Sequence, residues 1–175
     1  VGAPYNGGNG DRSGHARIFT WNGAGWVQQG ADIDGEAAGD YSGWSVALSA
    51  DGGTAIIGAP SNGGNGSASG HARIFTWNGT DDGWVQQGAD IDGEAISDVS
   101  GYSVALSADG GTAIIGAPYN GDNSGHARIF VWDSSTSGWV QQGDDIDGEA
   151  ANDLSGVSVA LSADGGTAII GAPGN

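Results

Sequence analysis

One segment of this chain, Ser-Val-Ala-Leu-Ser-Ala-Asp-Gly-Gly-Thr-Ala-Ile-Ile-Gly-Ala-Pro, occurs three times without a change, at residues 45–60, 103–118 and 158–173. In the first copy, Val46 and Leu48 alternate with small residues, Asp51-Gly52 supplies a tight turn, and residues 54–57 form a returning apolar run. Alternating residues on both sides of an Asp-Gly turn predict a β-hairpin. Three identical hairpins therefore constrain the chain to a repetitive fold.

The segments between the hairpins repeat as well. His15, His71 and His126 recur at spacings of 56 and 55 residues. In the first repeat, an extended run from Ser13 to Trp21 and a second run from Trp26 to Gln29 precede an acidic loop, residues 32–40. Together with the hairpin, this order predicts four short strands in each repeat and no sustained helix. The predicted repeats cover about residues 1–56, 57–114 and 115–169, and residues 170–175 begin a fourth repeat.

Repeats of this length with four antiparallel strands are typical of β-propeller blades, which pack against neighbours on both faces. In the run from His15 to Trp21, Ala16 and Ile18 lie on one face, and Phe19 lies on the other. Both faces therefore carry apolar side chains. The sequence predicts an all-β fold of three tandem four-stranded antiparallel blades that cannot stand singly.

The two ends carry complementary parts of a repeat. The chain starts with Val1-Gly2-Ala3-Pro4, which matches the tail of a hairpin, and it finishes with a hairpin, residues 158–173, without the third and fourth strands. We therefore expect a circularly permuted array with incomplete terminal blades, whose strand edges recruit partners. Three arrangements remain open: a dimer that closes a six-blade ring, an excerpt of a longer array, and a head-to-tail filament.

The charge of the chain restricts its partners. Four Arg and no Lys stand against 21 acidic residues, so the formal net charge is −17. Phosphates need cationic partners, so we expect no binding to nucleic acid, and no apolar run is long enough for insertion into a membrane. The chain has no Cys, so disulfides cannot stabilise it. An acidic, Gly-rich chain of this kind suits an extracellular or cell-surface location, with cations as plausible partners.

Two short motifs appear together in each repeat: Gly43-x-Ser45-Val46-Ala47 and, after the turn, Gly58-Ala59-Pro60. This pair resembles the FG-GAP repeats of integrin α-subunit propellers and of their bacterial and algal relatives. The resemblance implies propeller blades and an adhesive or structural role outside the cell. The pair recurs at Gly101-x-Ser103-Val104-Ala105 with Gly116-Ala117-Pro118 and at Gly156-x-Ser158-Val159-Ala160 with Gly171-Ala172-Pro173.

The turn inside the hairpin bears on calcium. Family members that bind calcium do so in a long Asp/Asn loop at this place, whereas here only Asp51-Gly52-Gly53 is present. One carboxylate is too few for the six to eight oxygen ligands of Ca²⁺. The turn also resembles the Asp-box hairpin of sialidase-type propellers, in which Asp accepts backbone hydrogen bonds. This resemblance implies a structural role for Asp51, Asp109 and Asp164.

The acidic loop is the candidate metal site. Its pattern, Asp-Ile-Asp-Gly-Glu-Ala-x-x-Asp, places alternating carboxylates around a Gly, which suits a hard cation such as Ca²⁺. Carboxylates that cap turns or face solvent give the same pattern, so both interpretations remain open. The candidate ligands are Asp32, Asp34, Glu36, Asp40, Asp90, Asp92, Glu94, Asp98, Asp145, Asp147, Glu149 and Asp153.

Three further patterns have both structural and functional interpretations. Each His is followed two residues later by Arg, which favours a His/Arg ladder between blades, paired with carboxylates, over a repeated metal or ligand site. Trp residues on both sides of each outer turn predict pairs across a hairpin rather than a sugar site. Asn65-Gly66-Ser67 and Asn78-Gly79-Thr80 are N-glycosylation sequons, so Asn65 and Asn78 are candidate glycosylation sites in a secreted eukaryotic protein.

Catalysis has little support in the sequence. The segment around Ser45 lacks the second Gly of a nucleophile elbow, and the chain has no Cys nucleophile. We predict a non-enzymatic extracellular scaffold, structural or adhesive, that associates with other copies of itself by completing its terminal blades. The alternative is a ligand-binding propeller that recognises a protein or a glycan, with calcium as its possible cofactor.

Overall fold

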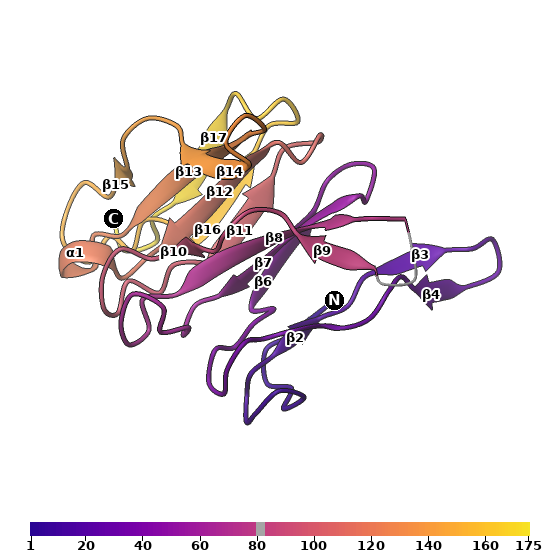
Figure 1. Ribbon diagram of the computed structural model, residues 1–175. Coiled ribbons are helices and arrows are strands. Elements are labelled where there is room, and N and C mark those ends of the chain that lie inside the picture. The colour runs from indigo at the N-terminus through magenta and orange to yellow at the C-terminus, as the bar shows by residue number, and fades with distance from the viewer. Residues whose placement is uncertain (80–82) are drawn as a thin grey trace.

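The computed structural model describes residues 1–79 and 83–175, and its regular elements are almost all short β-strands joined by turns and loops (Figure 1). All strand pairs in the described sheets are antiparallel, and the sheets follow one another from the N-terminus (indigo) to the C-terminus (yellow) in chain order. We refer to four successive parts: the N-terminal unit, the second unit, the third unit and the C-terminal hairpin.

The two middle units have the same topology. The second unit is ordered β6-β7-β8, and both β9 and β10 pair with β8; the third unit repeats this order as β11-β12-β13 with β14 and β15 on β13. The second unit consists of β6 (Ser45–Leu48), β7 (Thr54–Ala59), β8 (His71–Trp77), β9 (Trp84–Gln86) and β10 (Ile91–Asp92). The third consists of β11 (Ser103–Leu106), β12 (Thr112–Ala117), β13 (His126–Asp133), β14 (Gly138–Gln141) and β15 (Ile146–Asp147).

The terminal parts are smaller. The N-terminal unit has a three-stranded sheet, β1-β2-β5, and a separate hairpin, β3-β4, while the C-terminal hairpin contains only β16 and β17. The bounds are β1 (Gly2–Ala3), β2 (His15–Ala16), β3 (Phe19–Trp21), β4 (Trp26–Gln28), β5 (Ile33–Asp34), β16 (Ser158–Leu161) and β17 (Ala168–Gly171). A single helical turn, α1 (Asn120–Asn123), lies in the loop before β13.

The predicted all-β fold and its three hairpins are confirmed, but two details of the strand pattern are wrong. The residues after Asp32 do not all belong to a loop, because Ile33 is buried and Ile33–Asp34 pairs with β2 as β5. The edge position beyond the third strand thus holds two short strands instead of one. In addition, the run from Ser13 to Trp21 is not one strand: β2 and β3 are separated at Arg17 and Ile18, of which Arg17 bonds to Val1 just before β1.

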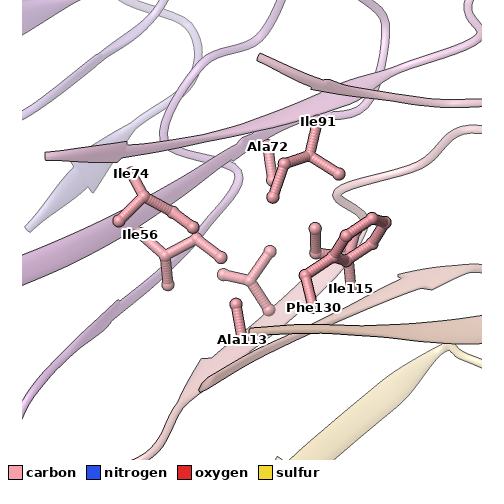
Figure 2. Packing of buried hydrophobic residues seen from close by; sticks show 8 residues of the cluster. Ile56, Ala72, Ile74, Ile91, Ala113, Ile115 and Phe130 are labelled. Carbon is pink, nitrogen blue, oxygen red and sulfur yellow. The ribbon is translucent and has the colours of Figure 1, made fainter. Parts of the chain in front are cut away.

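The core lies between successive units, as a propeller requires. Ile57 packs with Ala16, Ile18 and Ile33 of the N-terminal unit, whereas its neighbour Ile56 points the other way. Figure 2 shows Ile56 among residues of the second and third units, including Ala72, Ile74, Ile91, Ala113, Ile115 and Phe130. Each middle sheet thus buries apolar side chains on both faces, and each fully buried Ile contributes about 1.5–3 kcal/mol.

The paired Gly motifs have a geometric cause. A Cβ on Gly58 would lie 2.0 Å from the carbonyl oxygen of Gly101, in the next unit. Gly101 itself has φ +84°, and a Cβ there would lie 2.2 Å from the carbonyl oxygen of His71. Side chains at these two positions would therefore keep neighbouring backbones apart. Gly-x-Ser and Gly-Ala-Pro occur together because each forms one side of the same close approach between units.

The hairpin turns confirm the structural role of their Asp. The Gly53 N–H donates to Asp51 Oδ1 at 2.8 Å, and the Ser49 hydroxyl donates to the same oxygen at 2.6 Å. The Thr54 N–H in turn donates to Ser49 Oγ. These hydrogen bonds hold the carboxylate in its ionised form and lower the pKa of Asp51, the Ser49 hydroxyl being the largest cause. Asp109 and Asp164 make the same bonds with Ser107 and Ser162 and show the same lowered pKa.

Candidate functional site

The chemically distinctive side chains gather where one unit meets the next. His71 and Arg73 stand two residues apart on β8 and face Glu36, which follows β5 of the preceding unit. His126 and Arg128 on β13 face Glu94 in the same way. We call these two places the first joint and the second joint. The predicted His/Arg ladder between blades, paired with carboxylates, is confirmed at both.

At the first joint the imidazole of His71 is held between two carboxylates. Its Nδ1 lies 3.8 Å from Glu36 Oε2 and 3.7 Å from Asp90 Oδ2, and its side chain is only 1% exposed. Burial of the imidazole, and then the neighbouring Arg73 guanidinium, lowers the pKa of His71 below its usual 6.5. His71 is therefore neutral at physiological pH, although two carboxylates stand beside it.

The second joint repeats this geometry. His126 Nδ1 lies 4.0 Å from Glu94 Oε2 and 3.7 Å from Asp145 Oδ2. Burial, and then Arg128, lowers the pKa of His126 as well. Among the described residues, the two groups Glu36-His71-Asp90 and Glu94-His126-Asp145 are those that bring at least three His or carboxylate ligand atoms within 4.8 Å of one another.

Hydrogen bonds to backbone carbonyls tie the units together at the same joints. Arg73 donates to the Asp34 carbonyl oxygen at 2.7 Å, and its guanidinium lies over the ring of Phe75. Trp84 Nε1 donates to the Gln29 carbonyl oxygen at 3.0 Å. The second joint has the same bonds, from Arg128 to Asp92 and from Trp139 to Gln87. The sequence does not reveal these acceptors, because a carbonyl oxygen carries no side-chain signal.

The candidate metal ligands of each acidic loop do not gather at one point in the described structure. Asp40 is buried and accepts hydrogen bonds from the Ala37 N–H and the Asn62 amide, so it caps its own loop. Asp98 and Asp153 accept the equivalent bonds from the N–H groups of Ala95 and Ala150. In the described part of the chain, no three carboxylates of one loop converge. Calcium binding by these loops stays a prediction.

The remaining carboxylates follow the repeat. Asp32, Asp90 and Asp145 each accept a hydrogen bond from a Gln side chain four residues earlier. The last residues of β5, β10 and β15 are Asp34, Asp92 and Asp147. The backbone carbonyl oxygens of Asp34 and Asp92 accept the hydrogen bonds from Arg73 and Arg128. Glu36 and Glu94 belong to the joints, whereas the Glu149 carboxylate accepts a hydrogen bond from the side-chain amide of Asn175. Only the third copy of the Glu lacks a His and an Arg beside it in the described structure.

The aromatic pairs and the sequons have structural partners. Trp21 and Trp26 meet across the β3-β4 hairpin with ring centroids 5.8 Å apart, and the other two Trp pairs lie at 5.5 Å, which confirms their prediction. Asn65 donates to the Gly93 carbonyl oxygen, and Asn9, which has no sequon, makes the same bond to Gly35. The sequon at Asn78 extends to Thr80, outside the described residues. Glycosylation of Asn65 and Asn78 stays a prediction.

Comparison with known proteins identifies the repeat. Residues 32–75 match the family model described as FG-GAP repeat, a segment that runs from the acidic loop of the N-terminal unit through the hairpin β6-β7 and most of β8. The resemblance to FG-GAP repeats is therefore confirmed. FG-GAP repeats are typically extracellular. The matched segment contains Glu36, His71 and Arg73 of the first joint, whereas Trp84 and Asp90 lie beyond it.

A solved structure supports the propeller fold. The periplasmic gluconolactonase PpgL of Pseudomonas aeruginosa, a β-propeller lactonase, matches with a TM-score of 0.52 over 88% of this chain, at 14% sequence identity. The match spans 42% of the lactonase chain, so this chain corresponds to less than half of that protein. At this identity the likeness concerns the fold alone. No curated protein sequence matches the chain. Within the described residues, no helix has the length and apolar character to cross a membrane.

Proposed function

We propose that this chain is a non-enzymatic, extracellular β-propeller scaffold that associates with copies of itself, the C-terminal hairpin of one chain completing the N-terminal unit of the next. One observation carries the proposal: the equivalent Ile is buried in two copies of the hairpin and exposed to solvent in the third. Ile56 and Ile114 are 0% exposed, whereas Ile169 is 71% exposed. The three hairpins have identical sequences, so only the missing neighbours of β17 account for this difference.

The N-terminal unit offers a matching surface. An apolar cavity of about 580 Å³ lies between it and the second unit, lined among others by Ile18, Phe19, Val46 and Leu48. Val46 and Leu48 are 40% and 48% exposed, whereas Val104, the equivalent of Val46, is buried on β11, a strand that packs against both β6 and β16. The place that is open here is the one that a preceding hairpin fills at the interior joints. A second copy's β16-β17 hairpin has the required sequence.

The repeat fixes the register of this docking. In the second unit, Thr54 pairs with Thr76 and Ile56 with Ile74. By equivalence, Thr167 of one chain pairs with Thr20 of the next, and Ile169 pairs with Ile18. Residues 170–173 then take the place that Val1-Gly2-Ala3-Pro4 holds beside β2. The docking thus exchanges one Gly-Ala-Pro segment for another, as in a domain swap.

Polar groups left without inter-unit partners also match. Arg17, Trp26 and His15 are the copies of Arg73, Trp84 and His71, and Trp26 is 69% exposed. At the other end, the carbonyl oxygens of Asp147 and Gln142 and the carboxylate of Glu149 are the copies of their acceptors. Docking in this register would restore all of these contacts across the junction between two chains.

In this arrangement the N-terminal unit and the docked hairpin form one blade, so each chain contributes three blades. We assign β9 with β10, and β14 with β15, to a single broken fourth strand of each blade. Two chains then close a six-blade ring, or many chains continue as a filament. The lactonase name does not extend to this chain, because 14% identity supports only the fold, and the His and carboxylate groups lie at joints that repeat alike instead of in one distinct cleft.

The test is the mass of the purified chain in solution, measured by size-exclusion chromatography with light scattering and by electron microscopy. We expect dimers or fibres for the natural chain and monomers for Ile169→Glu, which places a charge in the buried joint. Ile96→Glu is the matched control, because Ile96 is 66% exposed on a loop away from both ends, and it should leave assembly unchanged. A natural chain that stays monomeric at high concentration, or assembly that survives Ile169→Glu, would contradict the proposal.

A further inference from the structure

The two joints contain buried imidazole nitrogens with no hydrogen-bond partner. Both ring nitrogens of His71 and of His126 are buried and accept or donate no hydrogen bond. Buried polar atoms are nearly always satisfied, and an exception calls for an explanation such as a water molecule or an ion. His71 Nδ1 lies 3.7 Å and 3.8 Å from its two carboxylate oxygens, which is too far for a hydrogen bond.

These separations suit atoms that share one metal ion. Zn²⁺ binds His nitrogen and carboxylate oxygen at about 2.0–2.2 Å, so two ligand atoms around one tetrahedral ion stand about 3.4 Å apart. At each joint the three ligand atoms lie within 4.8 Å of one another, and the buried imidazole points toward both carboxylates. A small closure of the two carboxylates would therefore complete a three-ligand site.

The two oxygens of the Glu36 carboxylate have different neighbours, one Arg73 and the other His71. Arg73 lies 3.7 Å from Oε1 of Glu36, whereas Oε2 of the same carboxylate faces His71. Arg73 is held in place by its bond to the Asp34 carbonyl oxygen. Glu36 and Asp90 keep 44% and 30% of their side chains exposed, so an ion can enter from solvent and reach an imidazole that is itself buried.

We propose that Glu36, His71 and Asp90, and likewise Glu94, His126 and Asp145, are two equivalent binding sites for a divalent transition-metal ion of the Zn²⁺ class. Each site takes Glu from one unit and His and Asp from the next, so a bound ion links successive units. The nitrogen ligand separates these sites from calcium sites, which are built of six to eight oxygens. Three protein ligands leave a fourth position for water.

Zn²⁺ titration of the Ile169→Glu chain by calorimetry tests the proposal, with the melting temperature as a second readout. This parent chain is expected to stay monomeric, so His15 meets no Glu149 of another copy, and the further substitutions are made in it. We expect two ions per chain, one for His71→Gln, and none at these sites for His71→Gln/His126→Gln. Zn²⁺ should raise the melting temperature of the parent chain, because binding favours the folded state, and this rise should vanish in the double variant. His15→Gln is the matched control, since its own joint lacks a Glu from a preceding unit, and it should still bind two ions.

Glu36→Gln/Glu94→Gln keeps both His residues and guards against a folding defect in the His variants. It should also abolish both sites while circular dichroism stays that of the parent chain. Binding of Ca²⁺ without binding of Zn²⁺, or Zn²⁺ binding that is equal in the parent chain and in both folded double variants, would overturn the proposal.

Discussion

The third unit and the C-terminal hairpin contain the same hairpin sequence but differ in almost everything that depends on neighbours. Ile114 is fully buried on the face of β12 opposite Ile115, which is the face toward the C-terminal hairpin, and Ile169 is 71% exposed. Ala108 in the third unit donates its N–H to the Ala163 carbonyl oxygen of the C-terminal hairpin, as Ala50 donates to Ala108. The C-terminal hairpin accepts this bond, and in the described part of the chain the Ala163 N–H donates no equivalent bond. The difference teaches that the fold of one repeat is completed by the next repeat.

Some features do not differ between these two regions. The Asp-Gly-Gly turn has the same hydrogen bonds at Asp109 and at Asp164, and β11-β12 and β16-β17 have the same register. Local hydrogen bonds thus define the hairpin itself, whereas burial is a property of the array. Substitutions at equivalent positions separate these two contributions.

The largest effect is expected from truncating the equivalent Ile residues. Ile114→Ala removes a fully buried side chain and should destabilise the folded chain by about 2–5 kcal/mol. Ile169→Ala in the monomer should change the free energy of unfolding by less than about 0.5 kcal/mol, because the side chain is largely exposed. Urea unfolding of both variants provides the measurement. Equal losses for the two variants in the monomer would break the comparison.

A smaller difference is expected for the Trp residues. Trp139→Phe removes the hydrogen bond to the Gln87 carbonyl oxygen, which should cost about 0.5–1.5 kcal/mol. Trp26→Phe should have less effect in the monomer, since Trp26 is 69% exposed. Assembly should raise the effect of Trp26→Phe to that of Trp139→Phe. Denaturant unfolding at low and high protein concentration would show this, and a concentration-independent Trp26→Phe effect would count against docking at this end.

The smallest expected effect is on stability at acid pH, and it should be the same in the third unit and in the C-terminal hairpin. Hydrogen bonds from Ser and Gly lower the pKa of Asp109 and Asp164 below the usual 3.8. A carboxyl group with a lowered folded-state pKa stabilises the fold above its unfolded value, and this contribution is lost as pH falls through the folded value. Asp109→Asn and Asp164→Asn should therefore both flatten the loss of stability below about pH 4, to a similar extent. Acid titrations followed by circular dichroism would reveal any difference between them.

Much of the fold could be predicted from the sequence, because its signals are local. The identical hairpins, the Asp turns and the Trp pairs each follow from residue types at fixed short spacings. The His and Arg two residues apart placed both side chains on one strand face and pointed to the joints. For Asp40 and its copies the sequence allows both metal binding and turn capping, and the structure shows the capping bonds, since a carboxylate beside a tight turn accepts the nearest N–H groups.

The rest of the joints depends on contacts between units. Arg73 and Trp84 bind carbonyl oxygens, which every residue has, so no pattern of side chains marks Asp34 or Gln29 as acceptors. The sequence does not predict the strand β5, because a single apolar residue, Ile33, between two Asp residues is the pattern expected of a loop. The convergence of Glu36 with His71 and Asp90 also needs the packing of two units, because the Glu comes from the unit before.

Cross-linking by an engineered disulfide tests most directly whether one chain completes the next. The natural chain has no Cys, and the docking register places Thr20 of one chain opposite Thr167 of another, as Thr76 lies opposite Thr54. Partners in an antiparallel pair have Cα atoms about 4.5–5.5 Å apart, within reach of a disulfide. Oxidised Thr20→Cys/Thr167→Cys should run as covalent dimers or ladders on non-reducing gels, and Thr20→Cys/Ile96→Cys should not. Oxidised Thr20→Cys/Thr167→Cys chains that remain monomeric would contradict the account.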